Sequence, residues 1–296
     1  MSLSSNQRLV VFGCGYVGSA VALRAQGQGL QVTALTRNSA TAEMLRHRGI
    51  ETIVGDLGSD DWHGQVPGSP AYILNCVSSG DPTLEGYRRS YLQGMESIAK
   101  WTRRAPAAGT LVYTSSTSVY PQGGGVAVDE TAATVHDENS ERAKILLAAE
   151  EALRRGSFGI SRWFVLRLAG IYGPGRQHFL DQVRAGEVSG QAETHLNLIH
   201  RDDIVGAIFA CFEAPAHVRN EVFNAVDDAP AGRGEIATWL ANALGVPPPD
   251  FTAVPSSPRR GITPDRIILN RKLRSTLAWQ PSFPTFREGY ANLLSP

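Results

Sequence analysis

Short apolar runs alternate with longer helix-forming stretches through the first half of the chain. The runs are rich in β-branched residues, which is typical of strands, and each stretch between them is long enough for a helix that covers one face of a sheet. Because the runs are continuously apolar, they predict a parallel sheet buried on both faces, and hence a doubly wound α/β fold. In chain order the predicted strands are LVVF (9–12), QVTAL (31–35), ETIV (51–54), AYILN (71–75), TLVYT (110–114) and WFVLRL (163–168).

The predicted helices lie at 17–28, 39–49, 87–104 and 141–155. After residue 168 the pattern changes, because Gly and Pro interrupt the chain at GIYGPGRQ and again at VPPPDFTAVPSSPRRGITP. The segment 201–214 nevertheless has the pattern of another helix of the first domain. We therefore expect a large domain over 1–172, to which 199–225 returns, and a smaller interleaved substrate domain made of 173–198 and 226–296.

Composition narrows the classes of function. The 28 basic side chains balance 28 acidic ones without runs of like charge, so a nucleic-acid or membrane-surface partner is not expected. No apolar stretch has the length that a bilayer requires. The three cysteines are scattered, which fits a reducing compartment, and neither CxxC nor HExxH spacing indicates a metal site. These features predict a soluble cytoplasmic protein, without a metal, that acts on a small molecule.

A glycine-rich turn follows the first predicted strand directly and opens a helix. Gly13, Gly15 and Gly18 form a GxGxxG motif, with Tyr16 and Val17 inside it. In a Rossmann domain the first glycine permits the tight turn, the second lets the backbone approach a pyrophosphate, and the third lets helix pack on strand. The helix N-terminus then directs its free amides at the phosphates. The motif therefore predicts a dinucleotide site on a Rossmann fold.

The end of the second strand indicates which dinucleotide binds. An NAD enzyme places an acidic residue there to bind the ribose 2′-hydroxyl, whereas this chain has Thr36 and then Arg37. A guanidinium suits a 2′-phosphate, so we expect NADP, with NAD as the alternative. Asp56 and Leu57, after the third strand, are expected beside the adenine, and Asn75 ends the fourth strand near the cofactor.

Several separated segments resemble one protein family. Together with the glycine motif, they are similar in order and spacing to the extended short-chain dehydrogenase/reductases, the NAD-dependent epimerase/dehydratase group. Phe12 stands where most extended members have the first glycine of GxxGxxG, a form seen in the atypical branch. The segments are TSSTSVY (114–120), RLAGIYGPGR (167–176), LIHRDDIVGAI (198–208) and VFNAVDD (222–228).

The resemblance implies a catalytic set that this chain matches only in part. Ser116 matches the family's substrate-orienting Ser. The family's YxxxK falls on Ser140 and Lys144, which we expect on one helical face, so the Tyr has become Ser while the Lys that grips the nicotinamide ribose is kept. The family's Asn in NxxG falls on Tyr91. A serine hydroxyl is far too weak an acid to replace a tuned phenol.

Another group must therefore supply the proton, or the chain is not an enzyme. Tyr91, Tyr120 and Tyr172 are expected within reach of the nicotinamide, and the family fold directs His178 toward the substrate cleft. For Tyr120 and Tyr172 the alternative is simple packing with a satisfied hydroxyl, and for His178 it is solvation on a loop.

Two functions therefore remain open. The first is an NADP-dependent epimerase, dehydratase or reductase acting on a sugar, a nucleotide-sugar derivative or another small polar carbonyl or hydroxyl compound, as a monomer or homodimer. The second is a catalytically disabled NADP(H)-binding sensor or regulatory protein. Only 23 residues separate Arg176 from His200, which is shorter than the family's usual nucleotide-sugar segment and weakens that substrate class. A scaffold without nucleotide would leave the glycine motif and Arg37 without a purpose.

Overall fold

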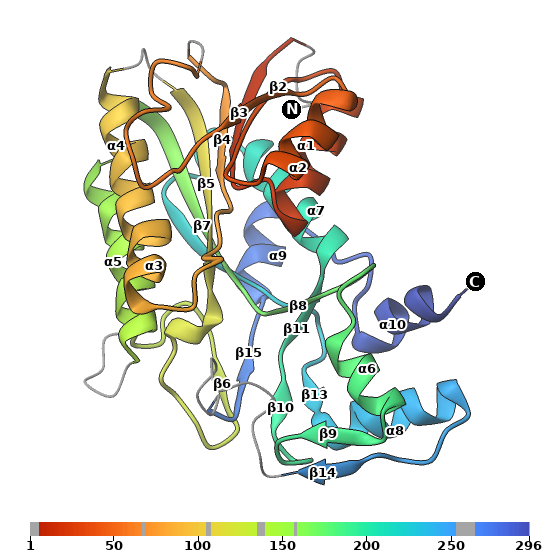
Figure 1. The fold of residues 1–296 in the computed structure, drawn as a ribbon. Coiled ribbons are helices and arrows are strands. Elements are labelled where there is room, and N and C mark those ends of the chain that lie inside the picture. The colour runs from red at the N-terminus through yellow and green to blue at the C-terminus, as the bar shows by residue number, and fades with distance from the viewer. Residues whose placement is uncertain are drawn as a thin grey trace. The chain divides into compact units, whose positions relative to one another are not determined.

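The computed structural model describes residues 6–66, 69–104, 108–134, 140–156, 159–252 and 264–295. A seven-stranded sheet forms its centre, with the strand order β12-β7-β5-β4-β1-β2-β3 (Figure 1). The pairs that run from β5 through β4, β1 and β2 to β3 are parallel. The strands are β1 (Arg8–Phe12), β2 (Gln31–Thr36), β3 (Glu51–Val54), β4 (Tyr72–Asn75), β5 (Ala108–Ser116), β7 (Ile160–Leu168) and β12 (Glu221–Ala225).

All six strands expected from the apolar runs are present, and β12 adds a seventh. The sheet order reverses at β1, whose neighbours β2 and β4 lead to opposite edges. In a doubly wound sheet, ligands bind at such a switch point, outside the carboxyl ends of the strands. The fold is therefore the expected Rossmann-like α/β class.

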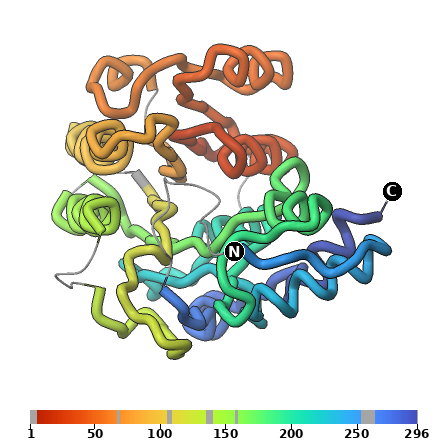
Figure 2. The backbone as a smooth tube through the Cα atoms, turned by 60° about the horizontal axis from the view of Figure 1, so that its bottom comes forward, coloured from red at the N-terminus to blue at the C-terminus, as the bar shows by residue number. Residues whose placement is uncertain are grey.

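Helices flank the sheet on both sides (Figure 1). The single helix expected at 87–104 is interrupted, because a π-helix, η1, separates two α-helical parts. The second part packs beside α5, and the two lie together in both views (Figure 2). The bounds are α1 (Tyr16–Gly27), α2 (Ser39–His47), α3 (Leu84–Arg88), η1 (Arg89–Gln93), α4 (Gly94–Arg104) and α5 (Glu141–Gly156).

The structure divides the chain into two compact units. The first contains 1–119, 137–167 and 207–223, and the second contains 120–136, 168–206 and 224–296. In this division 120–136 belongs to the second unit, whereas the sequence-based expectation assigned it to the large domain over 1–172. The reason is local: β6 (Val126–Val128), within that segment, pairs in parallel with β15 (Arg266–Ile268) far along the chain.

The second unit is built from small two-stranded sheets and short helices around its own apolar core. Residues 253–263 of the proline-rich stretch lie outside the described residues. No described helix meets the length and apolarity that a membrane span demands. Besides β6 and β15, its elements are β8 (Gly170–Tyr172), α6 (His178–Arg184), β9 (Glu187–Ser189), β10 (His195–Leu196), β11 (Leu198–His200), β13 (Ala231–Gly232), α8 (Arg233–Leu244), β14 (Asp250–Thr252), α9 (Arg271–Leu277) and α10 (Phe286–Leu294), with α7 (Arg201–Phe212) running from the second unit into the first.

Candidate functional site

A pocket of about 320 Å³ lies in the first unit, at the switch point of the sheet. Its walls come from the residues that directly follow β1, β2, β3 and β4, which is where a doubly wound sheet binds nucleotides. Six of the predicted cofactor residues line this one pocket. The lining residues are Gly13, Cys14, Gly15, Leu35, Thr36, Arg37, Asn38, Gly55, Asp56, Leu57, Cys76, Val77, Ser78, Gly80 and Ser90.

Glycine stands at each of the three positions of the motif for a different structural reason. Gly13 has φ +90°, and a Cβ there would lie 2.6 Å from the backbone N of Val77. A Cβ on Gly18 would lie 2.2 Å from the carbonyl oxygen of Gly13, so Gly18 is required by helix-to-turn packing. Gly15 differs, because a Cβ there would meet no atom within 4 Å. Packing therefore explains Gly13 and Gly18, whereas Gly15 leaves open space in front of the N-terminus of α1.

That open space fits a pyrophosphate. Gly15 is the N-cap of α1 and, having no side chain, makes no capping hydrogen bond of its own. The first turn of α1 carries no acidic residue that would repel an anion. Backbone amides that lack an internal partner, at the positive end of a twelve-residue helix, are the group that binds dinucleotide phosphates.

Phe12 replaces the first glycine of the family's usual motif for a packing reason. Its ring is fully buried, 4.7 Å from the ring of Trp62 and 5.9 Å from the ring of Trp101. The side chain therefore belongs to the core beneath β1, and the tight turn begins at Gly13 instead.

Arg37 is exposed at the pocket and makes no hydrogen bond with any residue that the structure describes. One Nη atom lies 3.6 Å from the position of a Cβ on Gly80. Asp81 is the next residue after Gly80. Hydrogen bonds from the backbone amide and the hydroxyl of Thr83 lower the pKa of the Asp81 carboxyl, and the nearby charge of Arg37 lowers it further. Sequence reasoning missed this acid, because it follows β4 and no motif joins it to the end of β2.

Three further predicted cofactor residues are held by local contacts. One carboxylate oxygen of Asp56 pairs with Nε of Arg89 at 2.9 Å, and the other accepts from the amide of Gly58 at 2.9 Å. Leu57 is 2% exposed and belongs to the core while its edge lines the pocket. Asn75 is buried at the end of β4, where its side-chain oxygen accepts from the amide of Val77.

Ser140 and Lys144, matched to YxxxK, lie one helical turn apart, and the amide of Lys144 donates to the carbonyl of Ser140 at 3.1 Å. Ser140 precedes α5, and its Oγ accepts from the amide of Ala143 at 3.2 Å, so it caps the helix. Lys144 is half exposed and pairs with Glu141 at 2.8 Å. Ser116 ends β5, and its Oγ accepts from the amide of Ser118. None of these three residues is among those that line the pocket of the first unit.

The other three predicted catalytic residues belong to the second unit. Tyr120 is 1% exposed and its hydroxyl donates to Oδ1 of Asn224 at 2.8 Å. Burial raises the pKa of Tyr172, whose hydroxyl is in tight contact with Gly289 and has no hydrogen-bond partner among the described residues. His178 is exposed at the start of α6, where its Nε2 lies 2.9 Å from the side-chain amide of Gln182.

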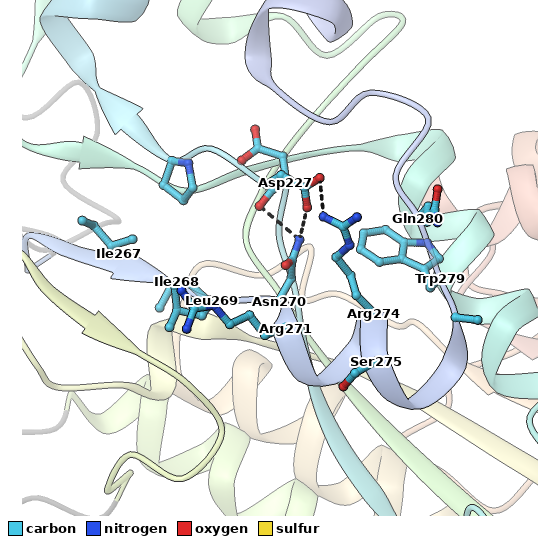
Figure 3. Close-up of a pocket in the computed structure, with 13 residues that line it drawn as sticks. Asp227, Ile267, Ile268, Leu269, Asn270, Arg271, Arg274, Ser275, Trp279 and Gln280 are labelled. Carbon is cyan, nitrogen blue, oxygen red and sulfur yellow. Dashed lines mark hydrogen bonds and ion pairs between the residues drawn. The ribbon is translucent and has the colours of Figure 1, made fainter.

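A larger pocket, of about 530 Å³, lies in the second unit beside α9 (Figure 3). Its polar side chains bind one another: Arg274 pairs with Asp228 at 2.7 Å, and Nδ2 of Asn270 donates to the same carboxylate at 2.8 Å. It contains no residue of the predicted site. Within the described ranges no group of three metal-ligating side chains is positioned to hold an ion. The smaller pocket of the first unit is therefore the candidate functional site.

Comparison with curated proteins identifies two informative relatives. Protein YeeZ of Escherichia coli K12 is 28% identical over 251 residues, covering 83% of this chain and 86% of that protein. The 3-diazoavenalumate denitrifying reductase of a Streptomyces species is 27% identical over 213 residues, covering 67% of this chain and 68% of the reductase.

A solved structure shows the same fold. The UDP-glucuronic acid 4-epimerase of Bacillus cereus, in complex with UDP-glucuronic acid and NAD, superimposes with a TM-score of 0.80 at 16% identity, covering 96% of this chain and 97% of that one. The family model that matches residues 9–225 is described as the NAD dependent epimerase/dehydratase family. This match includes the glycine motif, the pocket and the sheet, and the chain therefore belongs to the NAD-dependent epimerase/dehydratase family.

Proposed function

We propose that this chain is an NADP-dependent oxidoreductase that moves hydride between the nicotinamide and a small polar carbonyl or hydroxyl substrate. The observation that carries the proposal is the pocket of the first unit, which is lined both by Gly15, the N-cap of α1 with open space at its Cβ position, and by the exposed side chain of Arg37. An anion-binding helix end and a guanidinium fit the pyrophosphate and the 2′-phosphate of one molecule.

The residues divide the work of holding this cofactor. Gly15 and the first amides of α1 bind the pyrophosphate, and Arg37 binds the 2′-phosphate. Leu57 supplies the apolar surface for the adenine, beside the carboxylate of Asp56. Once bound, the nicotinamide supplies the hydride, and the protein supplies orientation, a dry pocket and a proton.

The substrate class rests on the relatives. The Bacillus cereus enzyme is crystallised with a nucleotide sugar, whereas the Streptomyces relative is named for the reduction of 3-diazoavenalumate. Because the higher sequence identity is to the reductase, we favour reduction of a small polar compound over epimerisation of a nucleotide sugar.

A second candidate function is a sensor that binds NADP(H) without turnover. The observation in its favour is that the position matched to the catalytic Tyr is held by Ser140, whose hydroxyl accepts a hydrogen bond from the amide of Ala143 at the start of α5. Such a protein would respond to the NADPH/NADP ratio through binding alone.

One experiment separates the two functions. NADPH is bound to the purified chain and its affinity measured by fluorescence, and its oxidation is then followed with a panel of sugars, aldehydes, ketones and diazonium compounds. Oxidation that depends on one compound class supports the oxidoreductase. Saturable NADPH binding without oxidation by any compound supports the sensor, and failure to bind either NADPH or NADH contradicts both.

A further inference from the structure

The hydroxyl of Ser90 is buried in the wall of the pocket of the first unit. Ser90 is 3% exposed and is one of the residues that line this pocket. Its Oγ has no hydrogen-bond partner within the part of the chain that the structure describes. Buried polar groups are almost always hydrogen-bonded, because an unpaired one loses its bonds to water and gains none in return. An unpaired hydroxyl in a pocket wall therefore indicates a ligand of that pocket.

A second buried serine shows that this hydroxyl is unusual for its surroundings. Ser97 lies on α4, two helical turns after Ser90, and is 2% exposed. Its Oγ donates to Oδ1 of Asp60 at 2.7 Å and lies 3.0 Å from Nε2 of His63. Ser90 makes neither a bond of this kind nor the bond to an earlier carbonyl that serine commonly makes within a helix. It lies on the π-helix η1, and π-turns within helices are frequently found at functional sites.

The contacts of η1 place Ser90 on one side of the pocket. Nε of Arg89, the preceding residue, pairs with the carboxylate of Asp56 at 2.9 Å. A Cβ on Gly58 would lie 2.9 Å from the carbonyl oxygen of Arg89, so η1 packs closely on the turn after β3. Asp56 and Leu57, from this turn, line the pocket as Ser90 does. Ser90 therefore lies on the side that we assign to the adenine.

The hydroxyl of Ser90 suits a hydrogen bond with adenine. A hydroxyl both donates and accepts, and adenine offers ring nitrogens as acceptors and an amino group as donor. The carboxylate of Asp56 is already bonded at both oxygens, to Arg89 and to the amide of Gly58. We propose that Ser90 hydrogen-bonds the adenine of the bound dinucleotide and positions it on Leu57. This inference rests on the proposed function, whose cofactor is that dinucleotide.

The proposal predicts effects of opposite sign when the hydroxyl is removed. In the free chain the unpaired hydroxyl is destabilising, so Ser90→Ala should raise the melting temperature by roughly 2 to 4 °C. In the complex the same variant lacks one hydrogen bond, so its affinity for NADPH should fall roughly twofold to tenfold. A serine that only supports the fold would change stability and affinity in the same direction.

The test compares Ser90→Ala with Ser97→Ala in the intact chain. Thermal unfolding without ligand and fluorescence titration with NADPH are measured for both variants. Ser97→Ala is the matched control, because Ser97 is bonded and is not among the pocket residues. It should lower the melting temperature and leave the NADPH affinity unchanged. Competition by adenosine 2′,5′-bisphosphate, which carries the adenine without the nicotinamide, should weaken in Ser90→Ala by the same factor as NADPH binding.

Each other result overturns a defined part of the account. A Ser90→Ala variant that binds NADPH as tightly as the wild type overturns the role of Ser90. So does a melting temperature that falls as it does in Ser97→Ala, since the hydroxyl would then be bonded in the free chain. Weaker binding of NADPH with unchanged competition by the bisphosphate contradicts the contact with adenine. Failure of the wild type to bind either NADPH or NADH overturns the proposed function itself.

Discussion

The proposed preference for NADP over NAD rests on a single exposed side chain, Arg37. Arg37 is positioned at the pocket and is free to pair with a 2′-phosphate, so Arg37→Ala should weaken NADPH binding by about 1.5 to 3 kcal/mol, or roughly tenfold to a hundredfold, and leave NADH binding nearly unchanged. Parallel fluorescence titrations with both cofactors measure this. Equal affinities for NADPH and NADH in the unmodified chain would contradict the role of Arg37.

Asp81 supplies a matched variant for the same titrations. Its charge acts on Arg37 and also opposes an approaching phosphate. Asp81→Asn should therefore tighten NADPH binding and have little effect on NADH, the opposite sign from Arg37→Ala.

Ser140 has a structural role that predicts a stability effect. Its Oγ satisfies the amide of Ala143 at the start of α5, so Ser140→Ala should lower the free energy of unfolding by about 1 kcal/mol. Denaturant titration measures this loss. Ser140→Asp keeps an acceptor at the cap and should retain most of the stability. Unchanged stability in Ser140→Ala would show that the cap contributes nothing.

At the residue scale the sequence predicted that the glycine turn and Arg37 lie near each other, and both line the same pocket. This was possible because each directly follows a predicted strand and precedes a predicted helix. Ser140 was matched to the catalytic Tyr by spacing alone, and spacing does not reveal that α5 begins one residue later. The π-helix η1 was not predictable, because the pattern of residues 87–104 shows no break.

At the scale of elements, one buried ion pair joins a helix to two strands. Glu150 of α5 is fully buried, and its carboxylate binds Arg167 of β7 at 2.7 and 3.0 Å and the hydroxyl of Ser115 of β5 at 2.7 Å. Ser115 is the neighbour of Ser116, so this pair also fixes the end of β5.

Removal of one partner would leave a buried charge without compensation. Glu150→Ala should therefore lower the free energy of unfolding by about 3 to 5 kcal/mol, measured by denaturant titration. The exposed neighbour Glu151 pairs with Arg155 at 2.6 Å, and Glu151→Ala should cost at most about 1 kcal/mol. A loss from Glu150→Ala no larger than that from Glu151→Ala would show that the buried pair does not hold the elements together.

The strands were predictable because a sheet that is covered on both faces needs continuous apolar runs. The short strands of the second unit were not, because two- or three-residue strands such as β10 and β13 carry no periodicity and exist only through pairing between distant segments. The same reason explains why the pairing of β6 with β15 could not be predicted: β6 is defined by its distant partner.

At the scale of the whole molecule, a buried carboxyl makes stability depend on pH. Asp227 is 3% exposed, and burial raises the pKa of its carboxyl to about 8, with further increases from Asp228, Asp203 and Glu288. The folded chain therefore keeps a proton that the unfolded chain has lost above its ordinary value of 3.8. Stability should be highest below that value and fall as the pH rises toward 8, by up to about 1.4 kcal/mol per pH unit.

Thermal unfolding at a series of pH values between 3.8 and about 8, the two pKa values of Asp227, measures this slope. Asp227→Asn should flatten it, while the exposed Asp250→Asn should leave it unchanged. Burial raises the pKa of Asp203 to about 6, so this carboxyl adds a decrease of stability of the same sign in both variants, over a narrower pH range that ends near 6. A wild-type curve that is flat up to pH 8 would refute the buried, protonated state of Asp227.

The central claim is that the pocket of the first unit binds a nicotinamide dinucleotide, and a titration of NADPH into wild type and Gly15→Val tests it most directly. A Cβ at Gly15 meets no protein atom, so this variant should fold with the circular dichroism and melting temperature of the wild type, whereas its side chain fills the space that the pyrophosphate needs. The account predicts saturable NADPH fluorescence in the wild type and none in Gly15→Val. Equal binding by both proteins would contradict it.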